Sequence, residues 1–174
     1  MKMLKAARAG AACLLLLLAG EIRSATTVVS ATVASFCLMA VTSNAVTLTI
    51  ANPASPGGVP DNPTNSSTYA QYSSTVASGV TRRVTAAWAS GNAAPTGCSL
   101  LLFAAVPSGK GTSAGTITLS TTAQNLVTGI GGCATGITAT SGAQLTYTLS
   151  IGTVTSLVAN QSKSATITLT LTDS

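Results

Sequence analysis

Beyond its first two dozen residues, this chain has very few of the side chains that carry acid–base chemistry. It contains no histidine at all, and past residue 24 its only acidic residues are Asp61 and Asp173. General acid–base catalysis needs a titratable group close to the reacting proton, and histidine or paired carboxylates usually supply it. There is also no Cys-x-x-Cys pair or histidine to complete a zinc site. We therefore expect a protein that is not an enzyme and that holds no metal or other cofactor.

Basic residues are scarce as well once the N-terminus is set aside. Past residue 24 only Arg82, Arg83, Lys110 and Lys163 remain, and with two aspartates they give a net charge of +2 instead of the +5 of the whole chain. A nucleic-acid surface needs clustered basic residues. The only adjacent pair is Arg82 with Arg83, and neighbouring residues of a strand point to opposite faces. We therefore expect no nucleic-acid partner.

The N-terminus has the pattern of a secretory signal peptide. Three basic residues among the first eight positions precede an apolar run at positions 11–19, which is too short to cross a bilayer. We place the cleavage site after Ser24, with a cut after Ala31 as the alternative, and a signal anchor retained in the membrane is the competing interpretation. We expect residues 1–24 to be the signal peptide and the mature chain to be secreted, outside the cell or on its surface, with no membrane span.

Removal of the signal peptide leaves an odd number of cysteines, namely Cys37, Cys98 and Cys133. An oxidising compartment favours one intramolecular disulfide. We predict a bond between Cys98 and Cys133, because each lies beside a glycine-containing turn where two strand ends can meet. Cys37, within an apolar stretch at positions 36–40, is then a buried free thiol, or alternatively the donor of an intermolecular bond.

Alternation of apolar residues with threonine is the main structural signal. At the C-terminus Ala165, Ile167, Leu169 and Leu171 alternate with threonines, which is typical of a half-buried strand. Similar alternation occurs at positions 46–50, 80–88, 116–120 and 145–150, with glycine or proline turns between these runs. Residues 37–174 are therefore expected to form one antiparallel all-β domain, a sandwich or a barrel.

The segment that follows the signal peptide, residues 25–36, also alternates. Val29, Ala31 and Val33 are separated by Ser30 and Thr32. One interpretation is an ordinary first strand of the domain. The other is a strand that is donated to a neighbouring subunit, in which main-chain hydrogen bonds supply affinity and alternate side chains fill pockets.

Aromatic side chains offer a candidate ligand site. Trp88 shares a strand face with Val84 and Ala86, which favours a place in the core. Tyr69 and Tyr72 follow a proline-rich stretch and are the candidate ligand contacts, because aromatic rings stack on sugars in carbohydrate-binding β-sandwiches.

The order of these parts resembles secreted fimbrial or coat subunits, such as the spore coat protein U family and chaperone-usher pilins. The shared features are the leader, the alternating strand after it, an early cysteine, a small all-β body and a final alternating strand. The chain differs from pilins in its cysteine placement and in having Asp173 where a tyrosine is expected near the C-terminus. The resemblance implies an immunoglobulin-like β-sandwich that polymerises by strand donation.

We therefore expect a structural subunit of an extracellular filament, pilus or coat, which assembles with copies of itself through β-strand and neutral-surface contacts. A secretion chaperone and a surface glycan are the further partners considered. The alternative is a secreted monomeric adhesin or carbohydrate-binding module.

Overall fold

The computed structural model describes residues 24–43 and 45–174. The predicted signal peptide, residues 1–24, lies outside the described residues except for Ser24, so it stays a prediction. Residues 24–35 have no regular secondary structure. From Phe36 onward the described chain is all-β, and its one helical element is the short 3₁₀ helix η1 (Val154–Ser156).

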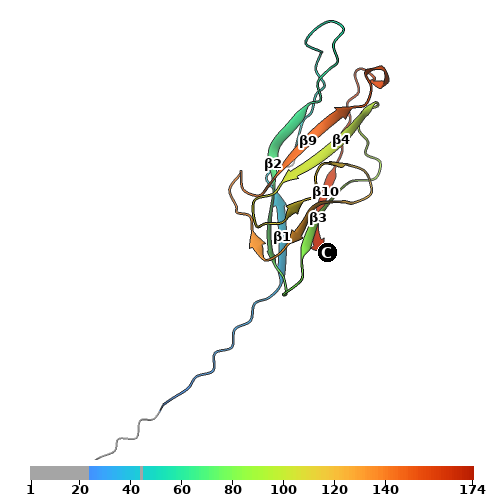
Figure 1. Ribbon diagram of the computed structural model, residues 1–174. Helices are drawn as coiled ribbons and strands as arrows, with labels where there is room; N and C mark the ends of the chain where they lie inside the picture. The colour runs from blue at the N-terminus through green and yellow to red at the C-terminus, as the bar shows by residue number, and fades with distance from the viewer. Residues whose placement is uncertain (1–23, 44) are drawn as a thin grey trace, which may run out of the picture. The chain divides into compact units, whose positions relative to one another are not determined.

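Ten strands follow one another along the chain (Figure 1). They are β1 (Phe36–Val41), β2 (Thr64–Thr75), β3 (Arg82–Trp88), β4 (Cys98–Ala105), β5 (Thr112–Ser113), β6 (Ile117–Thr118), β7 (Gln124–Ile130), β8 (Cys133–Ala134), β9 (Ala143–Ile151) and β10 (Ile167–Asp173).

The strands form two antiparallel sheets. The first sheet has the order β1-β2-β9-β4-β6, and the short strand β8 also pairs with β2. The second sheet has the order β10-β3-β7-β5. Strands β1 and β10 therefore stand at the ends of their sheets, each with a single neighbour within the described chain. These positions locate the candidate site described below.

A single apolar core joins the two sheets. Its largest fully buried side chains include Leu102 of β4 and Leu145 of β9 in the first sheet, and Val84 of β3 with Leu126 and Ile130 of β7 in the second. Because alternate residues of a strand face the same side, the apolar residues of each strand meet those of the other sheet. The arrangement is consistent with a β-sandwich, as the alternation in the sequence predicted.

One predicted strand takes a different form. The alternating stretch at positions 45–50 is assigned to no strand, although Val46, Leu48 and Ile50 are half-buried while Ala45, Thr47 and Thr49 are exposed. Val46 and Leu48 pack against the core. The stretch is thus extended and covers part of the core through its side chains, without a partner strand for its backbone.

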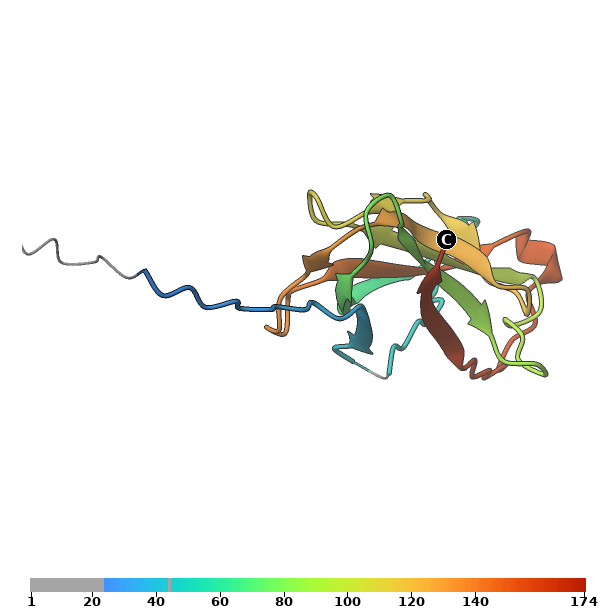
Figure 2. The same cartoon turned by 90° about the horizontal axis from the view of Figure 1, so that it is seen from below.

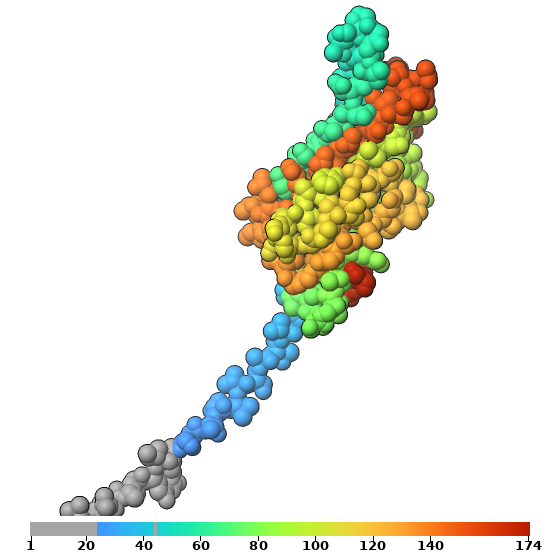
Figure 3. All heavy atoms as spheres, in the orientation of Figure 1, coloured from blue at the N-terminus to red at the C-terminus, as the bar shows by residue number. Residues whose placement is uncertain are grey.

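A long loop then leads to β2. Residues 51–63 contain no strand and rise beyond the ends of the sheets as a knob, coloured teal in Figure 3. The base of this loop is held by two hydrogen bonds to β9: Asn62 Oδ1 accepts from the Ile151 amide at 2.8 Å, and the Pro63 carbonyl accepts from the Leu149 amide at 3.0 Å.

Candidate assembly site

The two end strands β1 and β10 lie on the same side of the sandwich. They contact each other but form no strand pairing, and Figure 2 shows the connection after β1 running as coil in the space between β1 (blue) and β10 (dark red). We call this region the open seam. It is lined by the inward-facing side chains of the two strands, Cys37, Met39, Val41, Ile167, Leu169 and Leu171.

On β1 the inward face is only partly covered. Met39 stands opposite Tyr72 of β2, and Val41 stands opposite Ala70. Tyr72 and Ala70 are each 2 % exposed, whereas Val41 is 43 % exposed and Met39 only half-buried. The face that is fully covered on β2 is therefore open one strand further out, at the edge of the sheet.

On β10 the same incomplete burial occurs along the whole strand. Leu169 stands opposite Ala86 and Leu171 opposite Val84, and these β3 residues are 1 % and 0 % exposed. Ile167, Leu169 and Leu171 are only half-buried although they belong to the same inward face. A further layer of side chains would complete the burial of this row.

The outer edge of β10 also presents main-chain hydrogen-bonding groups. The Thr166 carbonyl accepts from the Ala89 amide at 2.9 Å, and the Ser174 amide donates to the Thr81 carbonyl at 3.0 Å, so the even-numbered residues face β3. Because this direction alternates along an antiparallel strand, the amides and carbonyls of Ile167, Leu169 and Leu171 face away from β3. Only the Leu171 carbonyl has a side-chain contact in the described structure, with the Cys37 thiol at 3.7 Å.

The segment that precedes β1 is apolar on alternate residues and uncovered. Val29 is 84 % exposed and Val33 is 82 % exposed, and Ala31 between them is also exposed. No strand is assigned to residues 24–35, so within one copy the expected strand at positions 25–36 begins only at Phe36. Its donation to another copy stays a prediction.

One end of the open seam is held together by Arg82. Its side chain is 8 % exposed and forms an ion pair through Nε with Asp173 at 2.8 Å. Its guanidinium also donates to the Phe36 carbonyl, to Ser74 Oγ at 3.2 Å and to Ser35 Oγ at 3.0 Å. Arg82 thereby connects the start of β1 and the end of β10, the two strands that border the seam.

The two predicted ligand-contact tyrosines do not form one site. They are three positions apart on β2, so their side chains face opposite sides of the sheet. Tyr72 is buried at 2 % exposure and donates from its hydroxyl to the Lys110 carbonyl at 2.8 Å. Burial raises the pKa of Tyr72 to about 12, and the nearby thiol of Cys133 adds to this shift. Tyr69 is half-buried on the other face and its hydroxyl accepts from Gln144 at 3.1 Å.

The predicted disulfide between Cys98 and Cys133 is not formed in this structure. Both residues are free thiols. Cys98 stands opposite Ile151 at one end of β9, and Cys133 stands opposite Ser74, beyond the other end of β9. The strand register separates them by roughly 30–40 Å at about 3.3 Å per residue, whereas a disulfide requires Cα atoms within about 7 Å. The two glycine turns that suggested the bond lie at opposite ends of the sheet.

The third cysteine also differs from its prediction as a buried thiol. Cys37 is exposed, because it lies on the inward face of β1, where the open seam leaves that face uncovered. Burial raises the pKa of the Cys98 and Cys133 thiols.

Metal-binding groups and membrane-spanning helices are two further features that were considered for the described residues. Residues 24–43 and 45–174 contain no group of three or more His, Cys, Asp or Glu side chains placed to hold a metal ion. The same part of the chain includes no helix with the length and apolar character to cross a membrane.

The open seam is therefore the most distinctive site of the described chain. It combines a half-buried apolar row with free main-chain groups, and its titratable side chains are the Cys37 thiol and the Arg82–Asp173 pair at one end. Comparisons with protein-family models, with curated proteins and with solved structures find no match to this chain.

Proposed function

We propose that this protein is a structural subunit of an extracellular filament or coat, and that its copies assemble by strand donation. In this proposal, the predicted donor segment up to residue 34 of one copy enters the open seam of the next copy and adds a strand beside β10, while Ser35 and Phe36 stay bound within their own copy. The observation that carries the proposal is the free edge of β10, whose apolar residues are half-buried and whose main-chain groups face away from β3. The domain is then an immunoglobulin-like sandwich completed by the neighbouring copy.

The N-terminal segment has the pattern that such a site requires. Val29, Ala31 and Val33 recur every second residue. The apolar residues of β10, Ile167, Leu169 and Leu171, have the same spacing. Burial of the two valines contributes about 3–6 kcal/mol, at about 1.5–3 kcal/mol for each side chain. Main-chain hydrogen bonds to the edge of β10 add to this energy and fix the register.

The charge distribution supports contact between copies. Residues 24–36 contain no charged side chain, and the one charged cluster at the seam is the Arg82–Asp173 pair, which is already formed within a copy. Insertion of the segment therefore desolvates no unpaired charge, a step that is otherwise costly. The contact is heterologous, because a segment of one copy meets a different surface of the next, and such contacts build open chains.

The cellular setting follows from the predicted signal peptide. We propose that the mature chain is secreted, is not an enzyme and acts outside the cell or at its surface. An uncovered strand edge with apolar residues can pair with strands of other chains and lead to aggregation. A secretion chaperone that covers the open seam before assembly is therefore the second partner that we propose.

The alternative of a monomeric adhesin or carbohydrate-binding module has less support at the residues first considered for it. Tyr72 is buried in the core, and Tyr69 is engaged with Gln144. A sugar site on this protein has to be sought elsewhere on the surface.

The test uses the mature full-length chain and two complementary variants. Val29→Asp places a charge in the donated segment, and Leu169→Asp places one in the seam. We expect the unmodified chain to form ordered polymers by electron microscopy and each variant alone to remain monomeric by analytical ultracentrifugation. A mixture of the two variants should form dimers and no longer species, because Val29→Asp retains an intact seam and Leu169→Asp retains an intact segment.

The matched control is Val59→Asp, which changes a 66 % exposed valine in the loop at positions 51–63, called the distal loop, and introduces the same charge. It should polymerise like the unmodified chain, and circular dichroism should show that all variants are folded. Polymers of Val29→Asp as abundant as those of Val59→Asp would overturn the proposal. An unmodified mature chain that stays monomeric at high concentration across salt and pH would overturn it as well.

A further inference from the structure

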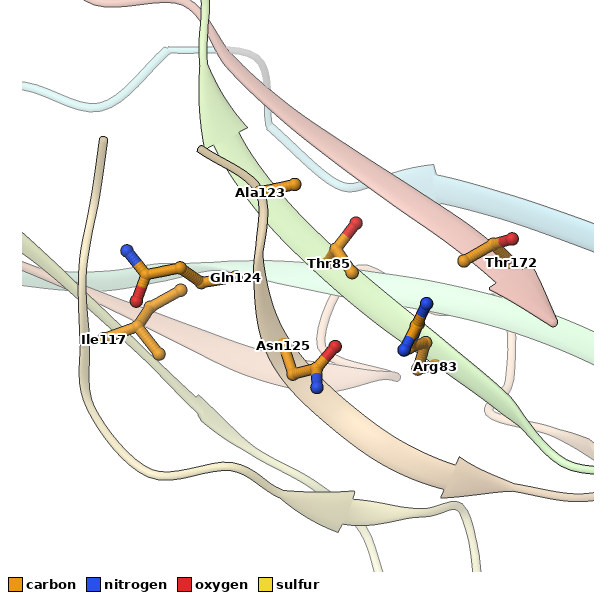
Figure 4. A pocket seen from close by; sticks show the side chains of 7 residues that line it. All are labelled: Arg83, Thr85, Ile117, Ala123, Gln124, Asn125 and Thr172. Atoms are coloured by element: carbon orange, nitrogen blue, oxygen red, sulfur yellow. The ribbon is translucent and has the colours of Figure 1, made fainter. Parts of the chain in front are cut away.

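The outer face of the second sheet carries a shallow groove, widely open to solvent, of about 660 Å³ that is separate from the open seam. Its polar side chains come from three adjacent strands (Figure 4): Arg83 and Thr85 from β3, Gln124 and Asn125 from β7, and Thr172 from β10. Arg83 stands opposite Thr172, and Thr85 stands opposite Asn125. The register therefore places the guanidinium within a row of hydroxyl and amide groups.

Arg83 has no charged partner in this groove. The one ion pair recorded within residues 24–43 and 45–174 is that of Arg82 with Asp173. Asp61, the other aspartate of the described chain, belongs to the distal loop at positions 51–63. Arg83 is half-buried, and its Nε is enclosed without a hydrogen-bond partner. Because this Nε is enclosed, the groups of Arg83 that a ligand can reach are its terminal guanidinium nitrogens.

The neighbouring groups leave hydrogen-bonding capacity free. Gln124 stands opposite the inward-facing Ala86, so it lies on the other face of β7 from Asn125, and it donates from Nε2 to the Thr118 carbonyl at 2.6 Å. Asn125 is exposed, and no hydrogen bond of its side chain is recorded. Ala123 adds an exposed methyl group to the lining, whereas Ile117 is a core residue with 8 % exposure.

These groups together match the chemistry of an acidic sugar. A guanidinium binds a carboxylate or a sulfate through two parallel hydrogen bonds. Amide and hydroxyl groups pair with sugar hydroxyls, and Thr85, Asn125 and Thr172 supply them beside Arg83. We infer that the groove around Arg83 binds an anionic sugar unit of an acidic glycan, with its carboxylate or sulfate on Arg83.

This inference does not depend on strand donation. The seam is lined by the inward faces of β1 and β10, whereas Arg83, Thr85 and Thr172 lie on the outward face of the second sheet. A subunit within a filament would keep the groove accessible, and repeated copies would raise the avidity for a glycan with many acidic units.

The test measures binding of defined oligosaccharides to the mature full-length chain by NMR titration. The probes are a hexamer of galacturonic acid for the carboxylate, a sulfated hexasaccharide for the sulfate and maltohexaose as the neutral control. We expect at least one acidic probe to bind, with shifts at the groove residues that weaken as salt rises, and maltohexaose not to bind. The acidic probe that binds more tightly identifies the anion.

Variants then test the role of Arg83. Arg83→Gln should weaken the binding about tenfold or more, the usual cost of losing hydrogen bonds between charged groups. Arg83→Lys should retain part of the binding, because an ammonium keeps the charge but not the two parallel bonds. Lys163→Gln removes the same charge from an exposed site outside the groove and should leave the affinity within about twofold.

Three results would overturn the inference: no binding of either acidic probe, equal binding of the neutral probe, or equal losses in Arg83→Gln and Lys163→Gln. Polymerisation of the Arg83 variants should be unchanged, so failure here is distinguishable from failure of the strand-donation proposal.

Discussion

Arg82 should be the most important charged residue for the stability of this fold, and Asp173 its least important partner. The Arg82 guanidinium satisfies three acceptors on two strands: the Phe36 carbonyl of β1, and Ser74 Oγ and the Thr75 carbonyl of β2. Replacement by leucine removes this donor from all three acceptors, although the Thr75 carbonyl still accepts from the Ser35 hydroxyl at 2.9 Å. Each acceptor deprived of its donor in a buried setting costs about 1–3 kcal/mol. Because water can reach part of the site, we expect Arg82→Leu to lower the free energy of unfolding by about 3 kcal/mol.

The contrast with Asp173 makes this prediction specific. The Asp173 side chain is 71 % exposed whereas that of Arg82 is 8 % exposed, so the carboxylate returns to water readily when the ion pair is lost. An ion pair at the surface contributes about 0–1 kcal/mol, and the buried Arg82 guanidinium keeps its hydrogen bonds to Ser35, Phe36, Ser74 and Thr75 when Asp173 is changed. Asp173→Asn should therefore cost less than about 1 kcal/mol, although it breaks the same ion pair at 2.8 Å.

Urea and thermal unfolding of the mature chain measure both effects. For a domain of this size about 1 kcal/mol corresponds to about 2–4 °C in Tm, so Arg82→Leu should melt about 6–12 °C lower and Asp173→Asn within about 4 °C of the unmodified chain. Arg82→Lys should lie between them, since an ammonium reaches fewer of the acceptors. Equal losses for Arg82→Leu and Asp173→Asn, or a loss below about 1 kcal/mol for Arg82→Leu, would refute the reasoning.

Two further predictions concern titratable groups. Burial raises the pKa of Tyr72 to about 12, whereas an unfolded tyrosine ionises near pH 10. The unfolded state therefore loses its proton first, and stability should be unaffected below about pH 10 and fall by about 2–3 kcal/mol as pH rises towards about 12. Tyr72→Phe should flatten this slope in urea unfolding, and an unchanged slope would contradict it. For the cysteines, we expect the mature chain to show three thiols in denaturant without reductant, and Cys37 to react first in the native state because burial raises the pKa of the Cys98 and Cys133 thiols. A count of one thiol would instead support a disulfide.

The strands that sequence reasoning located best are those with clear alternation. At β9 and β10 a two-residue period of apolar and hydroxyl side chains predicted the strand and its inward face, and the structure places Leu145 and Leu149 inside as expected. The signal is local, because each strand needs one covered face and one hydrated face wherever it stands in the sheet.

The same reasoning did not predict the longest strand. β2 (Thr64–Thr75) is rich in serine, threonine and asparagine, and its buried face includes Thr68 and Ser74 as well as Tyr72. Polar residues on both faces remove the period-two contrast, so no alternating run marks β2 in the sequence. The same gap in the pattern made Tyr72 look accessible for a ligand.

The sequence did not predict the groove around Arg83. It predicted only that Arg82 and Arg83 face opposite sides of their strand. The expectation that Arg82 and Arg83 face opposite sides agrees with the structure, which buries Arg82 and turns Arg83 to the outer face. Which of the two arginines meets the C-terminal aspartate depends on the pairing of β3 with β10, and no local pattern encodes that pairing.

By itself, the sequence determined the all-β class, the scarcity of acid–base side chains and the alternating apolar segment at residues 25–36. These properties depend on composition or on residues a few positions apart. The tertiary structure alone decided that β1 and β10 stand at the edges, that Cys98 and Cys133 lie far apart, and that Arg82 joins both ends of the domain. Such contacts connect residues 91 to 134 positions apart, as in Arg82 with Asp173 and Cys37 with Leu171. They follow from strand order, because central and edge strands share the same alternation and only their neighbours distinguish them.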